Sequence, residues 1–446
     1  MFNRVLVANR GEIAVRVIRA LHELGVEAVA IYSTVDRDAL HVRLADHAVC
    51  IGPPPAAESY LRIPNVVAAA VTAGCEAVHP GYGFLAENPA FVEACVDNDL
   101  VFVGPPADVM ATMGDKISAK QAMRAASVPT VPGTEGETAV SAARDAAEEI
   151  GYPVLLKASA GGGGKGMRLV HEPDDLEDAF ATAAAEAQAA FGDPRLYVEK
   201  ALVPARHVEI QVLCDEHGNV LTLGERECSI QRRHQKLIEE SPSAALSPEQ
   251  REAMEAAAER ACRAVGYRNA GTFEFLLGPD GSFYFIELNA RLQVEHPVTE
   301  MCTGLDIVRE QLRVASGEPL GVTGRAPRRG HAIEIRLNAE DPERDFMPAP
   351  GRVARFEPAQ GPGVRVDTFV ENGTMIPPFY DSLMAKLVVW DVDRPAAIAR
   401  AERALRETAI DGVPSTRDLA LDVLASEPFA SGDYSTSTLE ALRAVT

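Results

Sequence analysis

Two carboxylates, Glu274 and Glu287, occupy positions that a β-hairpin would place opposite each other. They lie in segments rich in strand-forming residues, and the Asp-Gly dipeptide at 280–281 between them is a strong turn signal. If these two residues form the turn, Glu274 faces Glu287, and Thr272 faces Asn289 on the same side of the sheet. Directly opposed side chains lie ~5 Å apart, where like charges destabilise a sheet.

A cation between the two carboxylates would reverse the sign of this interaction. At an effective dielectric constant of ~20 the repulsion is about 3 kcal/mol. Two carboxylates and an amide oxygen suit a hard ion, so the spacing predicts that Glu274, Glu287 and Asn289 bind Mg²⁺. The alternative is a solvated outer face on which these charges have no role.

Polar and apolar side chains continue to alternate beyond the hairpin. In an extended chain, alternate side chains point to opposite faces. The residues expected to pack on a core are Leu288, Ala290, Leu292 and Val294, and those expected on the other face are Glu287, Asn289, Arg291, Gln293 and Glu295. A solvated strand more often carries Thr, Lys and Ser, so this row favours a functional surface.

The composition is that of a globular protein with several domains. A chain of 446 residues with 47% hydrophobic content is long enough for about three domains. Its net charge of −22 argues against a nucleic-acid binder, which needs a basic patch. The seven cysteines form no Cys-x-x-Cys pair, which suits a reducing compartment. The sequence has no evident leader and no apolar run near the ~18 residues of a membrane span. We therefore expect a cytoplasmic protein that does not bind a membrane.

Strands and helices alternate from residue 4 to about residue 110. This rhythm predicts a parallel sheet covered by helices. The predicted strands are 5–8, 28–32, 76–79 and 100–103, and the predicted helices are 11–24, 66–73 and 89–96. The first strand–loop–helix turn, NRGEIA, has one glycine where the dinucleotide-binding fingerprint has three, so we interpret it as a feature of the fold.

Two further units are predicted after residue 113. A helix should begin at Ser247, which forms a capping box with Gln250, and end near Val265, before Gly266. The other predicted helices are 138–150, 174–191 and 394–408, and the predicted strands are 152–159 and the pair 195–202 and 206–215. The last unit begins near Gly330.

A run of four glycines, Gly161, Gly162, Gly163 and Gly164, follows the strand at 152–159. Such a loop lets backbone N–H groups approach an anion closely, and Lys157 and Lys165 could neutralise phosphate oxygens. The pattern is not a Walker A loop, because Gly166 follows the second lysine. A surface linker is the alternative, but the position after a buried strand favours a phosphate lid.

Two other stretches are unusually polar. Residues 226–240 carry Gln231, Arg232, Arg233, His234 and Lys236, which would ordinarily form a solvated charge cluster. Residues 331–341 alternate, with Glu334, Arg336 and Asn338 opposite Ile333, Ile335 and Leu337. Neither stretch indicates a function by itself.

Taken together, these segments resemble the biotin carboxylases of the ATP-grasp superfamily. The motifs that carry the resemblance are ANRGEIA, HPGYGFLAEN, GDK, KASAGGGGKGM, RHVEIQ, RRHQK and FIELNARLQVEHPVTE, in the family's order and spacing. The fold class expected is α/β and α+β: an N-terminal Rossmann-like parallel sheet (1–113), an ATP-grasp fold with a glycine-rich lid at about 132–203 (114–329), and a C-terminal mixed β/α domain (330–446).

The resemblance implies a two-stage reaction. MgATP (or MnATP) phosphorylates bicarbonate to carboxyphosphate, which releases CO₂, and the CO₂ carboxylates biotin on a biotin carboxyl carrier protein. This is the first half-reaction of an acetyl-CoA or acyl-CoA carboxylase. The implied partners are a carrier and a carboxyltransferase on separate chains, because the sequence contains no biotin attachment motif, and a second copy of the chain in a homodimer.

The resemblance also assigns roles to residues. Lys116, Lys157 and the loop Gly161–Gly164 would hold phosphates. Glu274, Glu287 and Asn289 would hold the metal. The expected adenine and ribose contacts are Glu199, Lys200, Leu202, His207, Gln231 and His234. Those expected to bind bicarbonate are Lys236, Arg291, Gln293 and Val294. Glu295 would be the general base, and Arg336 would stabilise the biotin enolate.

Three rival functions remain open from the sequence. Another ATP-grasp ligase with a different carboxylate acceptor is the nearest of them. A nicotinamide oxidoreductase is opposed by the missing glycine fingerprint. A catalytically inactive regulatory subunit is opposed by the intact set Lys236, Arg291, Glu295 and Arg336.

Overall fold

The N-terminal segment folds into a parallel sheet covered by helices, as the alternation predicts. The computed structural model describes residues 1–134, 136–159 and 167–445. The strands of this segment are β1 (Arg4–Val7), β2 (Glu27–Ser33), β3 (His47–Gly52), β4 (Ala77–His79) and β5 (Val101–Phe102), and the helices are α1 (Gly11–Glu23), α2 (Leu40–Leu44), α3 (Ile63–Thr72), α4 (Pro89–Val96) and α5 (Ala107–Gly114). The sheet order is β3-β2-β1-β4-β5. Strand β3, a largely exposed edge strand, is not among the predicted strands.

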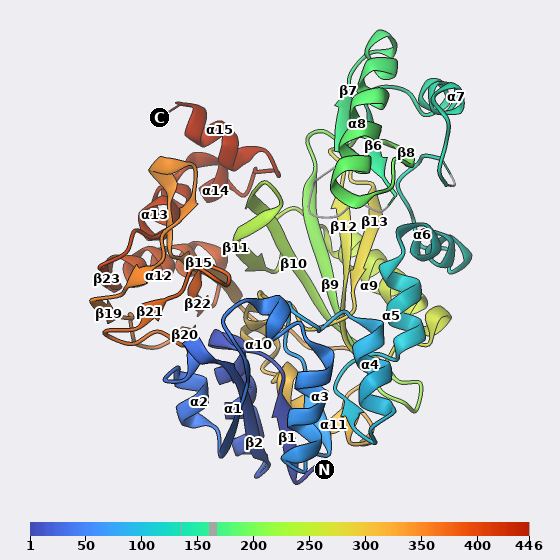
Figure 1. The fold of residues 1–446 in the computed structure, drawn as a ribbon. Helices are drawn as coiled ribbons and strands as arrows, with labels where there is room; N and C mark the ends of the chain where they lie inside the picture. Colours follow the sequence, from blue (N-terminus) through green and yellow to red (C-terminus); the bar gives the residue numbers. More distant parts are fainter. Residues whose placement is uncertain (135, 160–166, 446) are drawn as a thin grey trace.

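A separate lobe projects from the body of the molecule at the upper right of Figure 1. Its elements are α7 (Val140–Ile150), β6 (Val154–Ala158), β7 (Met167–Val170), α8 (Leu176–Phe191) and β8 (Leu196–Lys200), and α6 (Lys116–Ala125) precedes it. The sheet order in this lobe is β7-β6-β8. The predicted glycine loop, Gly161–Gly164, lies outside the described residues.

The centre of the molecule is a large, mainly antiparallel sheet (Figure 1). Its main strands are β9 (Arg206–Cys214), β10 (Val220–Arg232), β11 (Gln235–Ser241), β12 (Asn269–Leu277), β13 (Phe283–Asn289), β15 (His331–Asn338), β20 (Val364–Thr368) and β22 (Leu383–Asp391); the short β14 (Gly324–Arg325) pairs with β10. The order is β13-β12-β9-β10-β11-β15-β22-β20. The prediction that 195–202 and 206–215 pair is wrong, because β8 pairs with β6 in the lobe while β9 pairs with β10 and β12.

One face of this sheet packs on a core and the other carries polar groups. Helix α9 (Pro248–Val265) begins with the predicted capping box of Ser247 and Gln250 and ends at left-handed Gly266. It packs, with α3 to α5, against Val208, Ile210, Val212, Phe273 and Phe275. Since side chains alternate along a strand, His207, Glu209, Gln211, Thr272 and Glu274 are directed to the opposite face.

The hairpin of β12 and β13 has the predicted pairing where the carboxylates lie. Glu274 pairs with Glu287 and Thr272 with Asn289. The predicted two-residue turn is wrong, because Gly278 bonds Ser282 around a longer loop. A β-bulge between the Glu274 and Phe275 pairs then shifts the register by one residue and restores the predicted opposition.

The rest of the chain packs around the central sheet. The helices are α10 (His296–Thr303), α11 (Ile307–Ala315), α12 (Arg394–Glu407), α13 (Arg417–Ala425), α14 (Glu427–Ser431) and α15 (Thr438–Val445), and the short strands are β16 (Glu340–Asp341), β17 (Met347–Pro348), β18 (Gly351–Arg352), β19 (Arg355–Glu357), β21 (Met375–Ile376) and β23 (Ala409–Asp411). Among the described helices, each is too short or too polar to cross a membrane.

Candidate active site

The polar face of the central sheet forms the floor of a cavity of about 990 Å³. Residues from the N-terminal sheet, the lobe, the central sheet and the C-terminal segment all line it. The predicted site residues in its lining are Lys116, Lys157, Leu202, His207, Gln231, His234, Lys236, Glu274, Glu287, Asn289, Arg291, Gln293, Val294, Glu295 and Arg336. The fold therefore brings most of the predicted site together from widely separated parts of the chain.

The two opposed carboxylates have contrasting surroundings. Burial would raise the pKa of Glu274, but the charges of Lys236 and His207 outweigh it and hold that pKa well below its usual range. Glu287 is open to the cavity, and the charge of Glu274, more than burial, raises its pKa to about 7. An added cation beside Glu287 would relieve this repulsion, so the pair fits a divalent metal.

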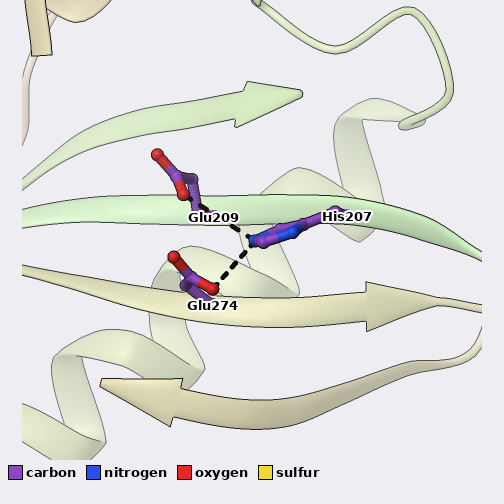
Figure 2. A group of neighbouring side chains, drawn as sticks. All are labelled: His207, Glu209 and Glu274. Atoms are coloured by element: carbon purple, nitrogen blue, oxygen red, sulfur yellow. Dashed lines mark ion pairs between the residues drawn. The ribbon is translucent and has the colours of Figure 1, made fainter. Parts of the chain in front are cut away.

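A second cluster of side chains has the spacing of metal ligands. His207, Glu209 and Glu274 bring ligand atoms within 4.8 Å of one another, and Figure 2 shows their side chains converging from β9 and β12. The His207 Nε2 atom lies 3.0 Å from Glu274 and 3.8 Å from Glu209. Although burial opposes it, the Glu274 charge raises the pKa of His207. At these distances the three side chains form an ion-pair cluster.

Asn289 adopts an orientation that a metal site would have to change. Its amide nitrogen donates to Glu274 Oε1 at 2.8 Å, and its amide oxygen accepts from Arg291 at 2.9 Å. In this structure the Asn289 amide oxygen is therefore engaged in a hydrogen bond with Arg291. Rotation of the amide would present that oxygen to an ion held by Glu274 and Glu287.

Lys236 is the electrostatic centre of the polar face. Its ammonium donates to Glu209 at 2.6 Å, to Glu274 at 3.1 Å and to Glu295. Three carboxylates around one ammonium leave a net negative charge, which the neighbouring arginines offset. Arg226, which is fully buried, donates to Glu209 and Gln211 on the same face.

Glu295 lies between two cations. Arg336 donates to Glu295 Oε2 at 2.8 Å and to Glu239 Oε1 at 2.6 Å, while Lys236 holds the other oxygen of Glu295. Burial would raise the pKa of Glu295, but Lys236 and Arg336 lower it far below the usual range. The carboxylate is therefore ionised and free of a proton, which is the state a general base requires.

Arg291 is held from the N-terminal segment. Its guanidinium donates to Glu87 Oε2 at 2.9 Å, and the Glu87 Oε1 atom accepts from the Ala290 backbone at 2.9 Å. Glu87 lies in the HPGYGFLAEN motif, yet the sequence analysis did not single it out. A long-range pair of this kind leaves no periodic signal in the sequence.

The lysines predicted to hold phosphates lie at the lobe side of the cavity. Lys157 is 2.7 Å from Glu199 Oε2, and Lys120, which the sequence analysis missed, is 2.7 Å from Glu199 Oε1. Burial and then the charge of Lys157 lower the pKa of Lys116. Mutual repulsion of these cations favours binding of an anion between them.

The side chains of Glu199 and Lys200, two predicted nucleotide contacts, already have partners within the protein. The Glu199 side chain is occupied by the two lysines. The Lys200 ammonium donates to the carbonyls of Gly151 and Tyr152, at 2.9 and 3.0 Å. A contact of Lys200 with adenine would therefore involve its backbone.

Three family models match the chain. "Biotin carboxylase, N-terminal domain" matches residues 1–110, "Carbamoyl-phosphate synthase L chain, ATP binding domain" matches 115–323, and "Biotin carboxylase C-terminal domain" matches 334–441.

Curated relatives and solved structures agree with these matches. A biotin carboxylase from Nostoc is 54% identical over 98% of this chain and 99% of its own length. A biotin carboxylase–β-γ-ATP complex from Campylobacter jejuni has a TM-score of 0.95 and 46% identity, covering 99% of both chains. The biotin carboxylase domain dimer of Hydrogenobacter thermophilus 2-oxoglutarate carboxylase, in complex with MgADP, ADP and bicarbonate, has a TM-score of 0.94 and 47% identity, covering 100% of this chain and 98% of that one. With this identity over nearly its whole length, the chain belongs to the biotin carboxylase family of ATP-dependent ligases.

Proposed function

We propose that this chain catalyses the ATP-dependent carboxylation of biotin on a biotin carboxyl carrier protein, the first half-reaction of an acyl-CoA carboxylase. Bicarbonate attacks the γ-phosphoryl group of ATP, which releases ADP and forms carboxyphosphate. Carboxyphosphate then breaks down to CO₂ and inorganic phosphate. The phosphate takes the proton of the ureido nitrogen of biotin, and the CO₂ adds to that nitrogen. The observation that carries the proposal is the ionised Glu295 between Lys236 and Arg336, in the same cavity as the phosphate-side lysines.

In this proposal, nucleotide and metal bind at the end of the cavity near the lobe. Lys116, Lys157 and the Gly161–Gly164 loop hold phosphates, and Glu274, Glu287 and Asn289 hold Mg²⁺ or Mn²⁺, which offsets phosphate charge when bound. The adenine and ribose contacts are Glu199, Lys200 through its backbone, Leu202, His207, Gln231 and His234. The metal assignment is supported by the raised pKa of Glu287 beside Glu274.

Bicarbonate binds beside Glu295. Lys236, Arg291, Gln293 and Val294 bind the anion, and Glu295 takes its proton. While Lys236 and Arg336 are held by Glu295, the carboxylate is a weak base. An incoming bicarbonate shares these cations, which raises the basicity of Glu295 at the moment a proton must be accepted. Arg336 then stabilises the negative enolate of biotin.

We further propose the domain division 1–113, 114–329 with a lid at about 132–203, and 330–446. The central sheet crosses the last boundary through the pairing of β11 with β15, so these two domains would move as one body. The carrier and carboxyltransferase are proposed to be separate chains. A homodimer and a cytoplasmic location complete the proposal, and the seven free cysteines suit that compartment.

The experiment that tests this function is an ATPase assay in which bicarbonate and biotin are omitted in turn. ATP cleavage should require bicarbonate and rise when free biotin is added. Cleavage that ignores bicarbonate but responds to another carboxylate would indicate a different ATP-grasp ligase.

A further inference from the structure

Lys386 is a fully buried cation at the junction of three distant segments. It lies on β22 and has no exposed side-chain surface. Its ammonium donates to the backbone carbonyl of Val294 at 3.0 Å and lies 3.1 Å from Glu12 Oε1 on α1. It also lies 5.9 Å from the centre of the Tyr82 ring. An isolated buried ammonium is strongly unfavourable, so the fold retains Lys386 through these partners.

The Val294 carbonyl belongs to the peptide that joins Val294 to Glu295. This peptide lies between the end of β13 and the start of α10, outside any strand ladder. Fixing the carbonyl fixes the plane of the peptide and hence the direction of the Glu295 side chain. In the sheet, Lys386 is also the direct cross-strand partner of Arg336, so it borders one of the two cations that hold Glu295 as well as the peptide that leads into Glu295.

The second arm of the network reaches the part of the cavity lining that the N-terminal segment supplies. The Tyr82 hydroxyl donates to Glu12, the carboxylate that pairs with Lys386. Both Tyr82 and Glu12 line the cavity. Burial raises the pKa of Glu12, although Lys386 opposes this effect, so without Lys386 this carboxylate would tend to take up a proton. One ammonium thus connects the wall at Tyr82 with the loop that carries Glu295.

We propose that Lys386 is a positioning residue for the bicarbonate step, which it serves by fixing the Val294–Glu295 peptide through the Val294 carbonyl. This inference rests on the proposed function, because it assigns Glu295 the role of base. Displacement of a reacting group by about 1 Å can lower a rate by about a hundredfold. Loss of Lys386 should therefore affect bicarbonate turnover more than nucleotide binding, since the phosphate-side lysines lie at the other end of the cavity.

A structural role and a positioning role predict different results for a double variant. In Lys386→Met alone, Glu12 is left buried without its cation, which is strongly destabilising. In Lys386→Met/Glu12→Gln, both charges are removed together, and Asp367, the second carboxylate near Lys386 at 3.9 Å, keeps its ion pair with Arg365. Stability should recover because paired removal is often nearly neutral. The glutamine can still accept a hydrogen bond from Tyr82. The double variant therefore separates stability from the lost bond to Val294.

The experiment compares steady-state ATP cleavage by wild type, Glu12→Gln, Lys386→Met and the double variant, with the melting temperature of each. We expect the double variant to regain the melting temperature but to show a kcat/KM for bicarbonate about tenfold to a hundredfold below that of Glu12→Gln, with the KM for MgATP within about twofold. Arg251→Met is the matched control. Arg251 lies 2.6 Å from the fully buried Glu225, and the cavity lining includes neither residue. This control should lose stability while keeping the kcat/KM for bicarbonate.

Two outcomes would overturn the inference, and they are distinguishable. If the double variant recovers both stability and the kcat/KM for bicarbonate, Lys386 has only a structural role and the proposed function stands. If wild type shows no bicarbonate-dependent ATP cleavage, the proposed function fails and the role of Lys386 fails with it.

Discussion

Glu274 and Glu287 face each other across the β12–β13 hairpin, and Glu274 is closely paired with His207 and Lys236. Lys236 and His207 keep Glu274 ionised against the effect of burial. The Glu274 charge in turn raises the pKa of Glu287 to about 7. Glu274 thus stabilises the site through its ion pairs. Glu287 destabilises the hairpin through its repulsion with Glu274 unless a cation binds.

This asymmetry predicts opposite effects of two similar substitutions in metal-free protein. At about pH 8, Glu287→Gln should increase the free energy of unfolding by about 1 kcal/mol, a value reduced by solvent in the open cavity. Glu274→Gln should decrease it by about 3 kcal/mol, because Lys236 and His207 lose a buried partner. Denaturant unfolding with a chelator present measures both changes.

Adding Mg²⁺ with a non-hydrolysable ATP analogue provides the control. Wild type should gain stability from the metal, and both variants should gain much less. Equal stabilisation of all three proteins by Mg²⁺ would contradict the assignment of the metal to this pair.

Removal of the proposed base should impair chemistry and spare nucleotide binding. We expect Glu295→Gln to lower bicarbonate-dependent ATP cleavage by about a hundredfold to ten-thousandfold, the usual contribution of a positioned base. The dissociation constant for ATP should stay within about twofold, because Glu295 contacts Lys236 and Arg336 and not the phosphate-side lysines. Stopped assays and calorimetric titration measure the two quantities, and a near-wild-type rate would refute the role.

The partner of Arg336 should produce a pH effect near neutrality. Burial raises the pKa of Glu239 to about 7, although the Arg336 charge opposes it. When Glu239 loses its proton, its charge-assisted bond holds Arg336 more firmly, so kcat/KM for biotin should rise by about fivefold between about pH 6 and pH 8. The Glu239→Gln variant should remain at the acidic level of wild type throughout this range. An unchanged inflection in the variant would assign the titration to another group.

A buried histidine should make the fold sensitive to acid. Burial lowers the pKa of His41 to about 4, although Asp36 opposes this effect, whereas an unfolded histidine has a pKa of about 6.5. The unfolded state therefore binds a proton first, so this contribution to stability is complete above about pH 6.5. It should decline by about 3 kcal/mol as the pH falls to about 4. Unfolding measurements across this range should show a shallower decline in His41→Gln than in wild type, and parallel curves would contradict the prediction.

Local periodicity predicted those parts of the structure that depend on neighbouring residues. The parallel N-terminal sheet and the capped helix α9 follow from alternation and capping residues. The opposition of Glu274 and Glu287 was also predicted, but through two errors that cancel. The turn is longer than expected, and the bulge restores the register; a bulge of this kind depends on packing that the sequence alone does not reveal.

The contacts that complete the site were missed because they join distant segments. Glu87 and Lys120 became visible only when the fold placed them beside Arg291 and Glu199. A signal for Lys386 does exist, since it is a single charge within the apolar run of β22. The alternation of side chains along β8 was a further signal in the sequence. Adjacent residues such as Glu199 and Lys200 point to opposite faces of a strand, so they cannot both direct their side chains to the nucleotide.

The most direct test of the proposed function follows the carbon of bicarbonate. Wild-type protein is incubated with radiolabelled bicarbonate, MgATP and free biotin, and the label recovered with biotin is measured. The proposal predicts labelled biotin that requires ATP and is nearly absent with Glu295→Gln. Bicarbonate-dependent ATP cleavage that leaves biotin unlabelled, or labelling that proceeds without ATP, would contradict it.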